Sequence, residues 1–358
     1  MMMRTFKNVL VTGGAGFIGA NFIRSLLGNP GFTGKVVTVD ALTYAGNREN
    51  LADIESEHGG KRYLFLKADI CDRQAIEDAF REHAIDAVVH FAAESHVDRS
   101  VKSPETFVHT NVLGTFTLLD VARQTWAGRP DVLFHHVSTD EVFGSLGETG
   151  SFTEQTRYDP RSPYSASKAG SDHLVMSYYH TYGLPVTISN CSNNYGPFQF
   201  PEKLIPLMIL NMLDGKPLPV YGDGGNVRDW LYVGDHCAAV WKIMTEGRAG
   251  ESYNVGGRNE WQNIRLVREL CAAVARATQK KASELETLIT FVKDRPGHDR
   301  RYAIDCTKIE RELGWRPSVS FEQGLELTVD WYLDHEQWVN HIRSGAYREW
   351  ITQNYGNR

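Results

Sequence analysis

The sequence predicts an α/β fold with a doubly wound parallel sheet and a smaller, mixed α/β C-terminal lobe. Through the first 190 residues, short apolar runs alternate with longer amphipathic stretches. This alternation produces βαβ crossovers, which place helices on both faces of a sheet. From about Cys191 onward, segments interrupted by Pro and Gly replace the alternation, and the change in pattern marks the start of the second lobe.

The strands of the predicted sheet are short, rich in β-branched residues and nearly continuous in hydrophobicity, as expected of strands covered on both faces. They fall at residues 8–11, 35–39, 63–66, 87–90, 132–137 and 186–189. The stretches between them show helical periodicity at residues 17–27, 73–83, 104–126 and 163–182. Two further helices are expected in the C-terminal lobe, at residues 266–282 and 321–332.

The length of 358 residues fits two domains at roughly 100–200 residues each. We expect a first domain over residues 1–190 and a second over residues 191–358, of which segments near 228–256 return to the first. The formal net charge of −6 argues against binding to nucleic acid or to an anionic membrane surface through bulk charge. The sequence therefore favours a small-molecule ligand.

Cysteine usage and the apolar runs indicate the compartment. The five cysteines are odd in number and form no CxxC pair, which is typical of a reducing compartment. No apolar run approaches the roughly 18 residues of a membrane-spanning helix, and the beginning of the sequence lacks the pattern of a secretory signal. We therefore expect a cytoplasmic protein that does not bind a membrane.

Three residues, His90, Glu94 and His96, raise the question of a metal site. They lie where a predicted strand runs into a loop, without the helical i, i+4 pairing of histidines that a zinc protease uses. We therefore expect no bound metal.

A glycine motif follows the first strand. In VLVTGGAGFIGA, Gly13, Gly16 and Gly19 have the spacing GxxGxxG at the start of the first helix. Such glycines let the backbone turn tightly and bring helix N–H groups to a pyrophosphate. Asp40 ends the second strand, where a carboxylate can accept hydrogen bonds from both hydroxyls of an adenosine ribose and would repel a 2′-phosphate. The motif therefore predicts NAD, in preference to NADP, as the cofactor.

A tyrosine and a lysine lie four residues apart in SPYSASK. Ser162 is a good N-cap and Pro163 suits the first helical position, so Tyr164 and Lys168 share one face near the start of a helix. The ammonium group and the helix N-terminus both favour the phenolate, and we expect them to lower the pKa of Tyr164 from about 10. A phenolate so placed can take a proton from a sugar hydroxyl as hydride leaves the same carbon.

Two consecutive carboxyl groups, Asp140 and Glu141, follow the fifth strand in VSTDEVFG. Neighbouring residues on a regular strand face opposite sides, so the pair acts together only if both lie past the end of the strand. Two close carboxyl groups in a partly dry site do not both ionise easily. One can then serve as an acid while the other serves as a base.

Together these motifs resemble the extended short-chain dehydrogenase/reductase family, which couples TGGAGFIG to a Tyr-x-x-x-Lys helix on a Rossmann fold. The Thr-Asp-Glu sequence at residues 139–141 is similar to the signature of the nucleotide-sugar dehydratases in that family. The resemblance spans essentially the whole chain, through VDALTYAGN, FAAESHVDRS, STDEVFG, SPYSASKAGSDHLV, CSNNYGPFQFPEKLIP, YGDGGNVRDWLYV and DRPGHDRRYAID. Phe143, Gly234 and Asn190 depart from the commonest pattern, in which Tyr, an acid and Arg are usual.

The resemblance implies an NAD-dependent hydro-lyase that takes dTDP-glucose to the 4-keto-6-deoxy sugar nucleotide and water. Tyr164, assisted by Lys168, would deprotonate the C4 hydroxyl, and Thr139 would hydrogen-bond the same oxygen. Glu141 would then remove the C5 proton as Asp140 protonates the departing C6 hydroxyl. Hydride taken from C4 by NAD would return to C6.

The resemblance also implies the remaining site residues and a homodimer built on the helices that contain Asn111 and Tyr164. Asn111 would support the catalytic pair. The implied cofactor contacts are Gly13, Gly16, Phe17, Ile18, Gly19, Asp40, Leu42, Thr43, Asp69, Ile70, Ala92, Ala93, Ser95, Thr110, Tyr164, Lys168 and Asn194. The implied substrate contacts are Glu94, Ser95, Thr139, Asn193, Lys203, Leu204, Pro219, Tyr221, Arg228, Asn263, Arg295, His298 and Tyr355.

Three other functions stay open. A UDP-sugar 4-epimerase or a UDP-glucuronate decarboxylase of the same family would use Tyr164 and Lys168 without an acid and a base at positions 140 and 141. An NAD-binding regulator without catalysis would be expected to lack at least one of these groups, and all are present. The mass of the product formed from dTDP-glucose distinguishes these functions.

Overall fold

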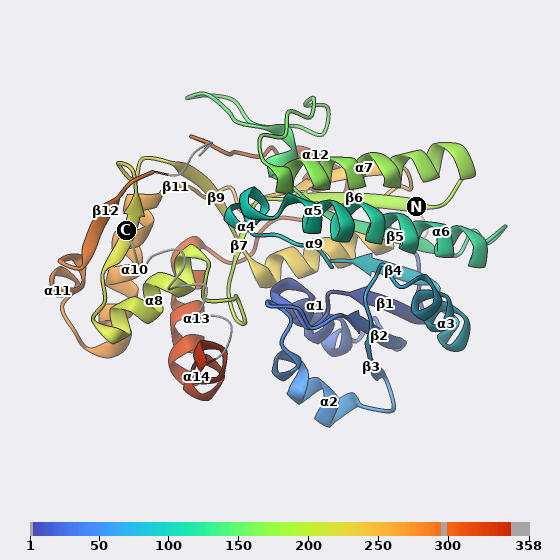
Figure 1. The fold of residues 1–358 in the computed structure, drawn as a ribbon, viewed down its shortest axis with the longest axis horizontal. Helices are drawn as coiled ribbons and strands as arrows, with labels where there is room; N and C mark the ends of the chain where they lie inside the picture. Colours follow the sequence, from blue (N-terminus) through green and yellow to red (C-terminus); the bar gives the residue numbers. More distant parts are fainter. Residues whose placement is uncertain (1–2, 295–298, 345–358) are drawn as a thin grey trace.

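Seven parallel strands form the central sheet of the computed structural model, in the order β10-β6-β5-β4-β1-β2-β3 (Figure 1). The structure describes residues 3–294 and 299–344. The strands are β1 (Asn8–Thr12), β2 (Lys35–Asp40), β3 (Tyr63–Lys67), β4 (Ala87–His90), β5 (Leu133–Thr139), β6 (Val186–Cys191) and β10 (Glu251–Val255). Strand order reverses between β1 and β4, and ligands of such sheets bind outside the carboxyl ends of the strands at that point.

Helices cover both faces of the sheet, as the near-continuous hydrophobicity of the strands predicts. Val9 and Val11 pack into one core with α1 and α9, whereas Leu10 packs into a second core with α3, α6 and α7. Successive side chains of a strand point to opposite faces, so both cores need apolar residues. The covering helices are α1 (Phe17–Gly28), α9 (Val233–Glu246), α3 (Arg73–His83), α6 (Thr115–Thr125) and α7 (Pro163–Tyr182). The predicted fold class is confirmed.

The helix expected over residues 104–126 is interrupted. It consists of α5 (Pro104–Phe107), a π-helical segment η2 (Val108–Gly114) and α6. π-Helical turns are rare overall, but those that do occur are often found at functional sites. Here the wide turn frees the carbonyl of Asn111 to accept from two hydroxyls, those of Thr115 at 2.6 Å and Ser171 at 2.6 Å.

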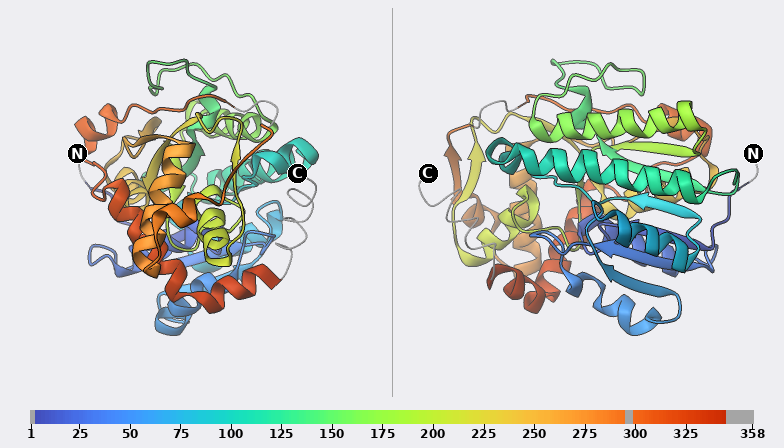
Figure 2. Two further views of the ribbon diagram at one scale, coloured as in Figure 1. Left: turned by 90° about the vertical axis from the view of Figure 1, so that its left-hand side faces the viewer. Right: turned by 45° about the vertical axis from the view of Figure 1, so that its right-hand side comes forward.

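The C-terminal lobe has a core of its own, separate from those of the sheet, and Figure 2 shows it gathered at one end of the molecule. Two small sheets belong to this region, β11-β9-β7 and β12-β8. Their strands are β7 (Asn193–Tyr195), β8 (Leu218–Tyr221), β9 (Val227–Tyr232), β11 (Glu260–Gln262) and β12 (Ile289–Val292). The helices of this core are α8 (Leu204–Asp214), α10 (Asn263–Thr278), α11 (Ala282–Glu286), α13 (Phe321–Asp334) and α14 (Glu336–Ser344).

The expected helix over residues 266–282 also differs from the structure. Helix α10 begins earlier, at Asn263, and ends at Thr278, because Gln279 adopts a left-handed conformation with φ of 55° and stops the helix. Residue 282 begins α11 instead.

The chain returns to the central sheet after β9. Helix α9 packs against α1, and β10 pairs with β6 as the seventh strand of the sheet. Shorter elements complete the description, namely η1 (Arg48–Leu51), α2 (Ala52–His58), α4 (Val97–Lys102), η3 (Asp140–Phe143) and α12 (Thr307–Leu313). No helix in the described ranges combines the length and the apolar character needed to cross a membrane.

Candidate active site

The glycine motif forms a turn that only glycine fits. Gly13 has φ of +68°, and a Cβ on it would lie 2.7 Å from the backbone nitrogen of Ala92. A Cβ on Gly19 would lie 2.3 Å from the carbonyl oxygen of Gly13. Helix α1 begins just after Gly16, and no side chain caps its first N–H groups. The loop therefore leaves a close backbone approach and a helix N-terminus for an anion, which fits the pyrophosphate of NAD.

Asp40 lies at the end of β2, where the ribose-binding carboxylate is expected. Its Oδ2 accepts from the Ala15 N–H at 2.9 Å and its Oδ1 accepts from the Leu42 N–H at 2.8 Å. Burial raises the pKa of Asp40, and these two backbone hydrogen bonds oppose the rise. A carboxylate has about four lone-pair sites, so Asp40 keeps acceptor capacity for ribose hydroxyls while it orders the loop.

Two other implied cofactor contacts, Ala92 and Asn194, are held by hydrogen-bonded neighbours. Thr12, at the end of β1, hydrogen-bonds His90 at 2.7 Å, and its hydroxyl accepts from the Ala92 N–H at 3.3 Å. Asn194 is on β7, and its amide oxygen lies 2.9 Å from Nδ1 of His236. Burial lowers the pKa of His236 to about 3, so a neutral ring orients the Asn194 amide.

Asn111 is almost fully buried in the π-helical segment. Its Oδ1 accepts from the Glu94 N–H at 2.8 Å, and its Nδ2 donates to the Glu94 carbonyl at 3.0 Å and to Ser167 Oγ at 2.8 Å. Asn111 thereby joins the loop after β4 to α7, the helix that carries Tyr164.

Tyr164 and Lys168 lie on the buried face of α7, whose capping box is formed by Ser162 and Ser165. The Lys168 ammonium donates to the Val137 carbonyl at 2.9 Å. The ammonium nitrogen also lies 3.4 Å from Nε2 of His136. These contacts hold the Lys168 ammonium group against the carboxyl-terminal half of β5.

The expected lowering of the Tyr164 pKa is wrong for this structure. Burial raises the pKa of Tyr164 well above its ordinary value, and the negative charge of Glu141 raises it further, while a hydrogen bond with Thr139 acts in the opposite direction. Burial also lowers the pKa of Lys168, which the charge of Asp172 opposes. The prediction failed because it counted the two favourable charges and left out the removal of the phenol from water.

Asp140 and Glu141 lie past the end of β5, as the sequence predicts, on the short 3₁₀ helix η3 rather than in an open loop. Thr139 caps η3, since its hydroxyl accepts from the Glu141 N–H at 3.3 Å. The same hydroxyl donates to Asp140 Oδ1 at 3.3 Å. Because the chain turns at this point, the strict alternation of side chains along β5 does not continue through Asp140 and Glu141.

The two carboxyl groups differ in their surroundings. Asp140 is 2% exposed, whereas Glu141 is only partly buried. Burial raises the pKa of Asp140 well above its ordinary value, the charge of Glu141 raises it further, and Arg228 opposes the rise. Asp140 therefore keeps its proton at a pH where an exposed aspartate has lost it, which suits a general acid.

The implied substrate residues come from several elements. Arg228 on β9 is buried, donates to the carbonyls of Val227 and Asp299 at 2.7 and 2.9 Å, and lies 4.3 Å from the ring centroid of Tyr302. Lys203, at the N-cap of α8, donates to the Ser95 carbonyl at 3.3 Å. This bond joins the loop after β4 to the C-terminal lobe.

The remaining implied residues are spread over both lobes. Glu94 and Ser95 follow β4, Asn193 is on β7, Leu204 begins α8, Pro219 and Tyr221 are on β8, and Asn263 begins α10. Asn263 has a buried amide oxygen without a hydrogen-bond partner. Arg295, His298 and Tyr355 lie outside the described residues.

A buried carboxylate that the sequence motifs did not indicate, Asp172, lies one turn beyond Lys168 on α7. It accepts hydrogen bonds from Ser138, at 2.8 Å, and from Tyr158, at 2.9 Å. Asn190, one of the positions that departs from the common pattern, donates to Asp172 at 3.5 Å and to the Thr139 carbonyl at 3.2 Å. The i, i+4 spacing from Lys168 is the signal that could have identified it.

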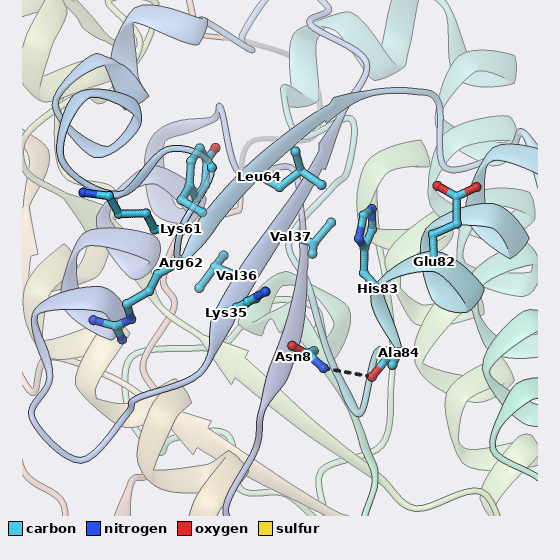
Figure 3. A pocket seen from close by; sticks show the side chains of 12 residues that line it. Asn8, Lys35, Val36, Val37, Lys61, Arg62, Leu64, Glu82, His83 and Ala84 are labelled. Carbon is cyan, nitrogen blue, oxygen red and sulfur yellow. Dashed lines mark hydrogen bonds between the residues drawn. The ribbon is translucent and has the colours of Figure 1, made fainter.

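A pocket of about 300 Å³ lies at the amino ends of the strands, and Figure 3 shows it. Its lining comes from the starts of β1, β2 and β3 and from the end of α3, where Asn8 donates to the Ala84 carbonyl at 3.2 Å. Because ligands of doubly wound sheets bind at the carboxyl ends of the strands, this pocket is separate from the candidate active site.

Within the described ranges, no three His, Cys, Asp or Glu residues gather as metal ligands.

Residues 10–328 match the family model described as GDP-mannose 4,6 dehydratase. The chain belongs to this family. Among curated relatives, "dTDP-glucose 4,6-dehydratase 1" of Escherichia coli K12 is 53% identical, over 98% of this chain and 99% of its own length.

Solved structures of this family's members and of related enzymes share the fold. The dTDP-glucose 4,6-dehydratase DesIV of Streptomyces venezuelae, solved with NAD bound, is 47% identical with a TM-score of 0.85, over 94% of this chain and 99% of that chain. The UDP-glucose 4-epimerase of Thermotoga maritima, solved with UDP-glucose, is 30% identical with a TM-score of 0.81, over 91% of this chain and 99% of that chain. The dehydratase is clearly the more similar in sequence, although the two TM-scores are close.

Proposed function

We propose that the protein is an NAD-dependent hydro-lyase that converts dTDP-glucose to dTDP-4-keto-6-deoxyglucose and water. The observation that carries the proposal is the placement of Asp140, a carboxyl group that is 2% exposed and directly precedes Glu141 on η3. Its burial raises its pKa. Elimination of water needs an acid and a base on adjacent carbons, and an epimerase does not. The 53% identity to the E. coli dTDP-glucose 4,6-dehydratase over 98% of the chain supports the same substrate.

Oxidation at C4 begins the reaction. Tyr164 removes the proton of the C4 hydroxyl, and Lys168 favours the phenolate by its charge. Thr139 hydrogen-bonds the same sugar oxygen and holds it toward Tyr164. NAD, when bound, accepts hydride from C4 and later returns it to C6. Because the Tyr164 pKa is raised in the protein without ligands, the positive charge that Lys168 supplies is needed for this step.

Elimination follows from the acidity of the C5 hydrogen beside the new ketone. Glu141 removes that proton, and Asp140, which holds its own proton, donates it to the departing C6 hydroxyl. A proton returned to C5 then completes the product. Since Asp140 and Glu141 are consecutive on η3, the acid and the base reach neighbouring carbons of one sugar.

The cofactor is held by residues at the carboxyl ends of the strands. The glycine loop and the start of α1, with Gly13, Gly16, Phe17, Ile18 and Gly19, bind the pyrophosphate. Asp40 accepts from the ribose hydroxyls and excludes NADP. The further contacts in this proposal are Leu42, Thr43, Asp69, Ile70, Ala92, Ala93, Ser95, Thr110, Tyr164, Lys168 and Asn194.

The nucleotide diphosphate of the substrate is bound by cations from the C-terminal lobe. Lys203 and Arg228 suit phosphate oxygens, and burial of Arg228 strengthens its interaction with an anion. The further contacts are Glu94, Ser95, Thr139, Asn193, Leu204, Pro219, Tyr221 and Asn263, together with Arg295, His298 and Tyr355. Residues 1–190 form the NAD-binding domain in this proposal, and residues 191–358 mainly bind the substrate, with segments near 228–256 returning to the first domain.

Mass spectrometry of the product tests the function. With dTDP-glucose, the expected product is lighter than the substrate by one water. A product of unchanged mass, identified as the C4 epimer, would instead establish a 4-epimerase. Absence of any reaction, with release of carbon dioxide from UDP-glucuronate, would establish the decarboxylase.

The protein also forms a homodimer in this proposal, through the helices that carry Asn111 and Tyr164. Exposed apolar side chains gather along the helical stretch before and within α6, with exposed fractions of 66% for Val101, 56% for Val108, 43% for Leu113 and 38% for Phe116. Exposed apolar side chains favour association where they lie against a partner. Sedimentation of the wild type is expected to give a dimer and that of Leu113→Asp a monomer, and a monomeric wild type at micromolar concentration would contradict the dimer.

The proposed compartment is the cytoplasm. All five cysteines are free, and four of them are buried. Free thiols persist where glutathione and thioredoxin keep them reduced. Fractionation of the producing cells, with a cytoplasmic and a periplasmic marker as controls, tests this assignment.

A further inference from the structure

The polar cluster beneath Lys168 is built around Asp172. Asp172 is 1% exposed and lies one helical turn after Lys168 and two turns after Tyr164 on α7. A buried carboxylate is costly unless charges or hydrogen bonds compensate it. The chemistry of its neighbours therefore indicates what the carboxylate does.

One carboxylate oxygen of Asp172 accepts hydrogen bonds from three uncharged donors. Oδ2 accepts from Ser138 Oγ at 2.8 Å, from Tyr158 Oη at 2.9 Å and from Asn190 Nδ2 at 3.5 Å. The donors come from β5, from the segment before α7 and from β6. Three elements distant in sequence thus fix the position of this oxygen.

The ring of His136 lies between the other carboxylate oxygen of Asp172 and the ammonium group of Lys168. Oδ1 lies 3.2 Å from His136 Nε2 without a well-aligned hydrogen bond, and the same Nε2 lies 3.4 Å from Lys168 Nζ. Burial and the charge of Lys168 lower the pKa of His136 well below its ordinary value, so the ring is neutral. The carboxylate and the ammonium are therefore the opposite charges of this cluster, with a neutral ring between them.

We propose that Asp172 is a positioning residue for the oxidation step, which keeps Lys168 protonated so that the ammonium can stabilise the Tyr164 phenolate. The proposal rests on the proposed function. Among the causes that act on the pKa of Lys168, burial lowers it and Asp172 is the larger of the two groups that raise it. Without that charge, a fully buried lysine tends to lose its proton.

Other titratable groups near Lys168 do not replace Asp172. Cys191, on β6, has its pKa raised to about 12 by burial, so the thiol carries no charge at neutral pH. His136 on β5 and His90 on β4 are neutral because burial lowers the pKa of each. Asp140 on η3 has its pKa raised by burial. Asp172, with its pKa raised to about 6, is ionised at neutral pH.

The decisive experiment isolates oxidation from elimination. dTDP-6-deoxyglucose has no C6 hydroxyl to lose, so its reaction stops after C4 oxidation and is followed by the near-ultraviolet absorbance of reduced nicotinamide. In Asp172→Asn, we expect the acidic limb of the pH–rate profile to move to higher pH by about one to three units, the range of a nearby opposite charge. At neutral pH the oxidation rate falls accordingly, and it recovers at higher pH.

A double-mutant cycle separates this role from simple packing. If Asp172 acts through Lys168, then Asp172→Asn changes the oxidation rate little in a Lys168→Met background, because the charge it supports is already gone. Additive losses in the double variant would overturn the proposal. The double variant also leaves no unpaired charge in the cluster, which favours its folding.

Asp235→Asn is a matched control, since Asp235 is a buried helical aspartate whose carboxylate accepts from Ser318 and Val319. It is expected to lower stability without moving the pH profile. An Asp172→Asn protein with lower stability and an unmoved profile would reduce Asp172 to the same structural role.

Two further variants keep the test decisive. If Asp172→Asn does not fold, Tyr158→Phe removes one hydrogen bond that lowers the Asp172 pKa and leaves the carboxylate in place. Its profile is expected to move in the same direction by a smaller amount, and an unmoved profile would count against the proposal.

Asp172→Glu, which restores the charge, is expected to recover the neutral-pH rate in part. A wild type that neither reduces NAD with dTDP-6-deoxyglucose nor removes water from dTDP-glucose would contradict the proposed function itself, not the role of Asp172.

Discussion

Asn111 donates a hydrogen bond of 2.8 Å to Ser167, and Ser167 in turn donates to the backbone carbonyl of Tyr164 at 2.7 Å. The π-helical segment is thereby connected directly to the turn of α7 that carries Tyr164. The Ser171 hydroxyl adds a second connection, since it donates to the Asn111 carbonyl at 2.6 Å. Asn111 therefore sets the position of Tyr164 relative to the loop after β4.

Removing the Asn111 side chain should loosen this connection. Asn111→Ala deletes three hydrogen bonds and leaves buried partners unpaired, so we expect the free energy of unfolding to fall by about 2–4 kcal/mol. Misplacement of Tyr164 should lower the C4 oxidation rate by roughly 10²-fold. Denaturant unfolding and the oxidation assay measure the two effects. Thr117→Ala, which removes a hydroxyl that donates to the Leu113 carbonyl four residues earlier, should leave the oxidation rate unchanged.

Asp140→Asn and Glu141→Gln should separate the two halves of the reaction. General acid and base groups contribute roughly 10²- to 10⁴-fold each, so water loss should fall by that amount. Oxidation of dTDP-6-deoxyglucose should persist, because Tyr164 and Lys168 remain. Product mass and nicotinamide absorbance are followed in parallel. Water loss at near wild-type rate in either variant would refute the assigned roles.

The raised pKa of Asp140 predicts a pH dependence of stability. Burial first, and the charge of Glu141 second, hold its folded-state pKa well above the unfolded value, which is about 3.9. The stability gained from this group is complete below about pH 4 and is lost as the pH rises through the folded-state pKa. Asn does not titrate, so the Tm of Asp140→Asn should rise relative to wild type as the pH increases from about 4. A pH-independent difference in Tm would contradict the raised pKa.

Gly13→Ala should impair both the fold and cofactor binding. The backbone φ of +68° costs a non-glycine residue roughly 1–2 kcal/mol, and the added methyl would lie 2.7 Å from the Ala92 nitrogen. We expect the Kd for NAD, measured by calorimetry, to rise at least about tenfold, which corresponds to about 1.4 kcal/mol. Gly28→Ala is the control, because a Cβ there, at the far end of α1, meets nothing within 4 Å. Unchanged NAD binding in Gly13→Ala would contradict the assigned pyrophosphate loop.

Some features of the site depended on neighbours that local sequence does not reveal. The spacing in TGGAGFIG and in SPYSASK predicted a glycine turn and a Tyr–Lys pair on one helix, both of which the structure contains. Such features can be predicted because they are defined within a few residues. The π-helical turn at Asn111 was not predicted, and the hydroxyls that donate to its carbonyl come from α6 and from the distant helix α7. The direction of the Tyr164 pKa was wrong because burial by other segments outweighs the local charges.

The sequence by itself determined the strand and helix alternation, and with it the doubly wound sheet, because each strand's hydrophobicity reports how both of its faces are covered. It also determined which groups are available for chemistry. The sequence predicted that segments near 228–256 return to the first domain, but only the tertiary structure decided that residues 251–255 pair with β6 as the seventh strand. It also decided that Asp172 lies beside His136, the ring next to Lys168. These contacts join segments that are distant along the chain, and the free energy of a buried charge depends on everything that surrounds it rather than on its sequence neighbours.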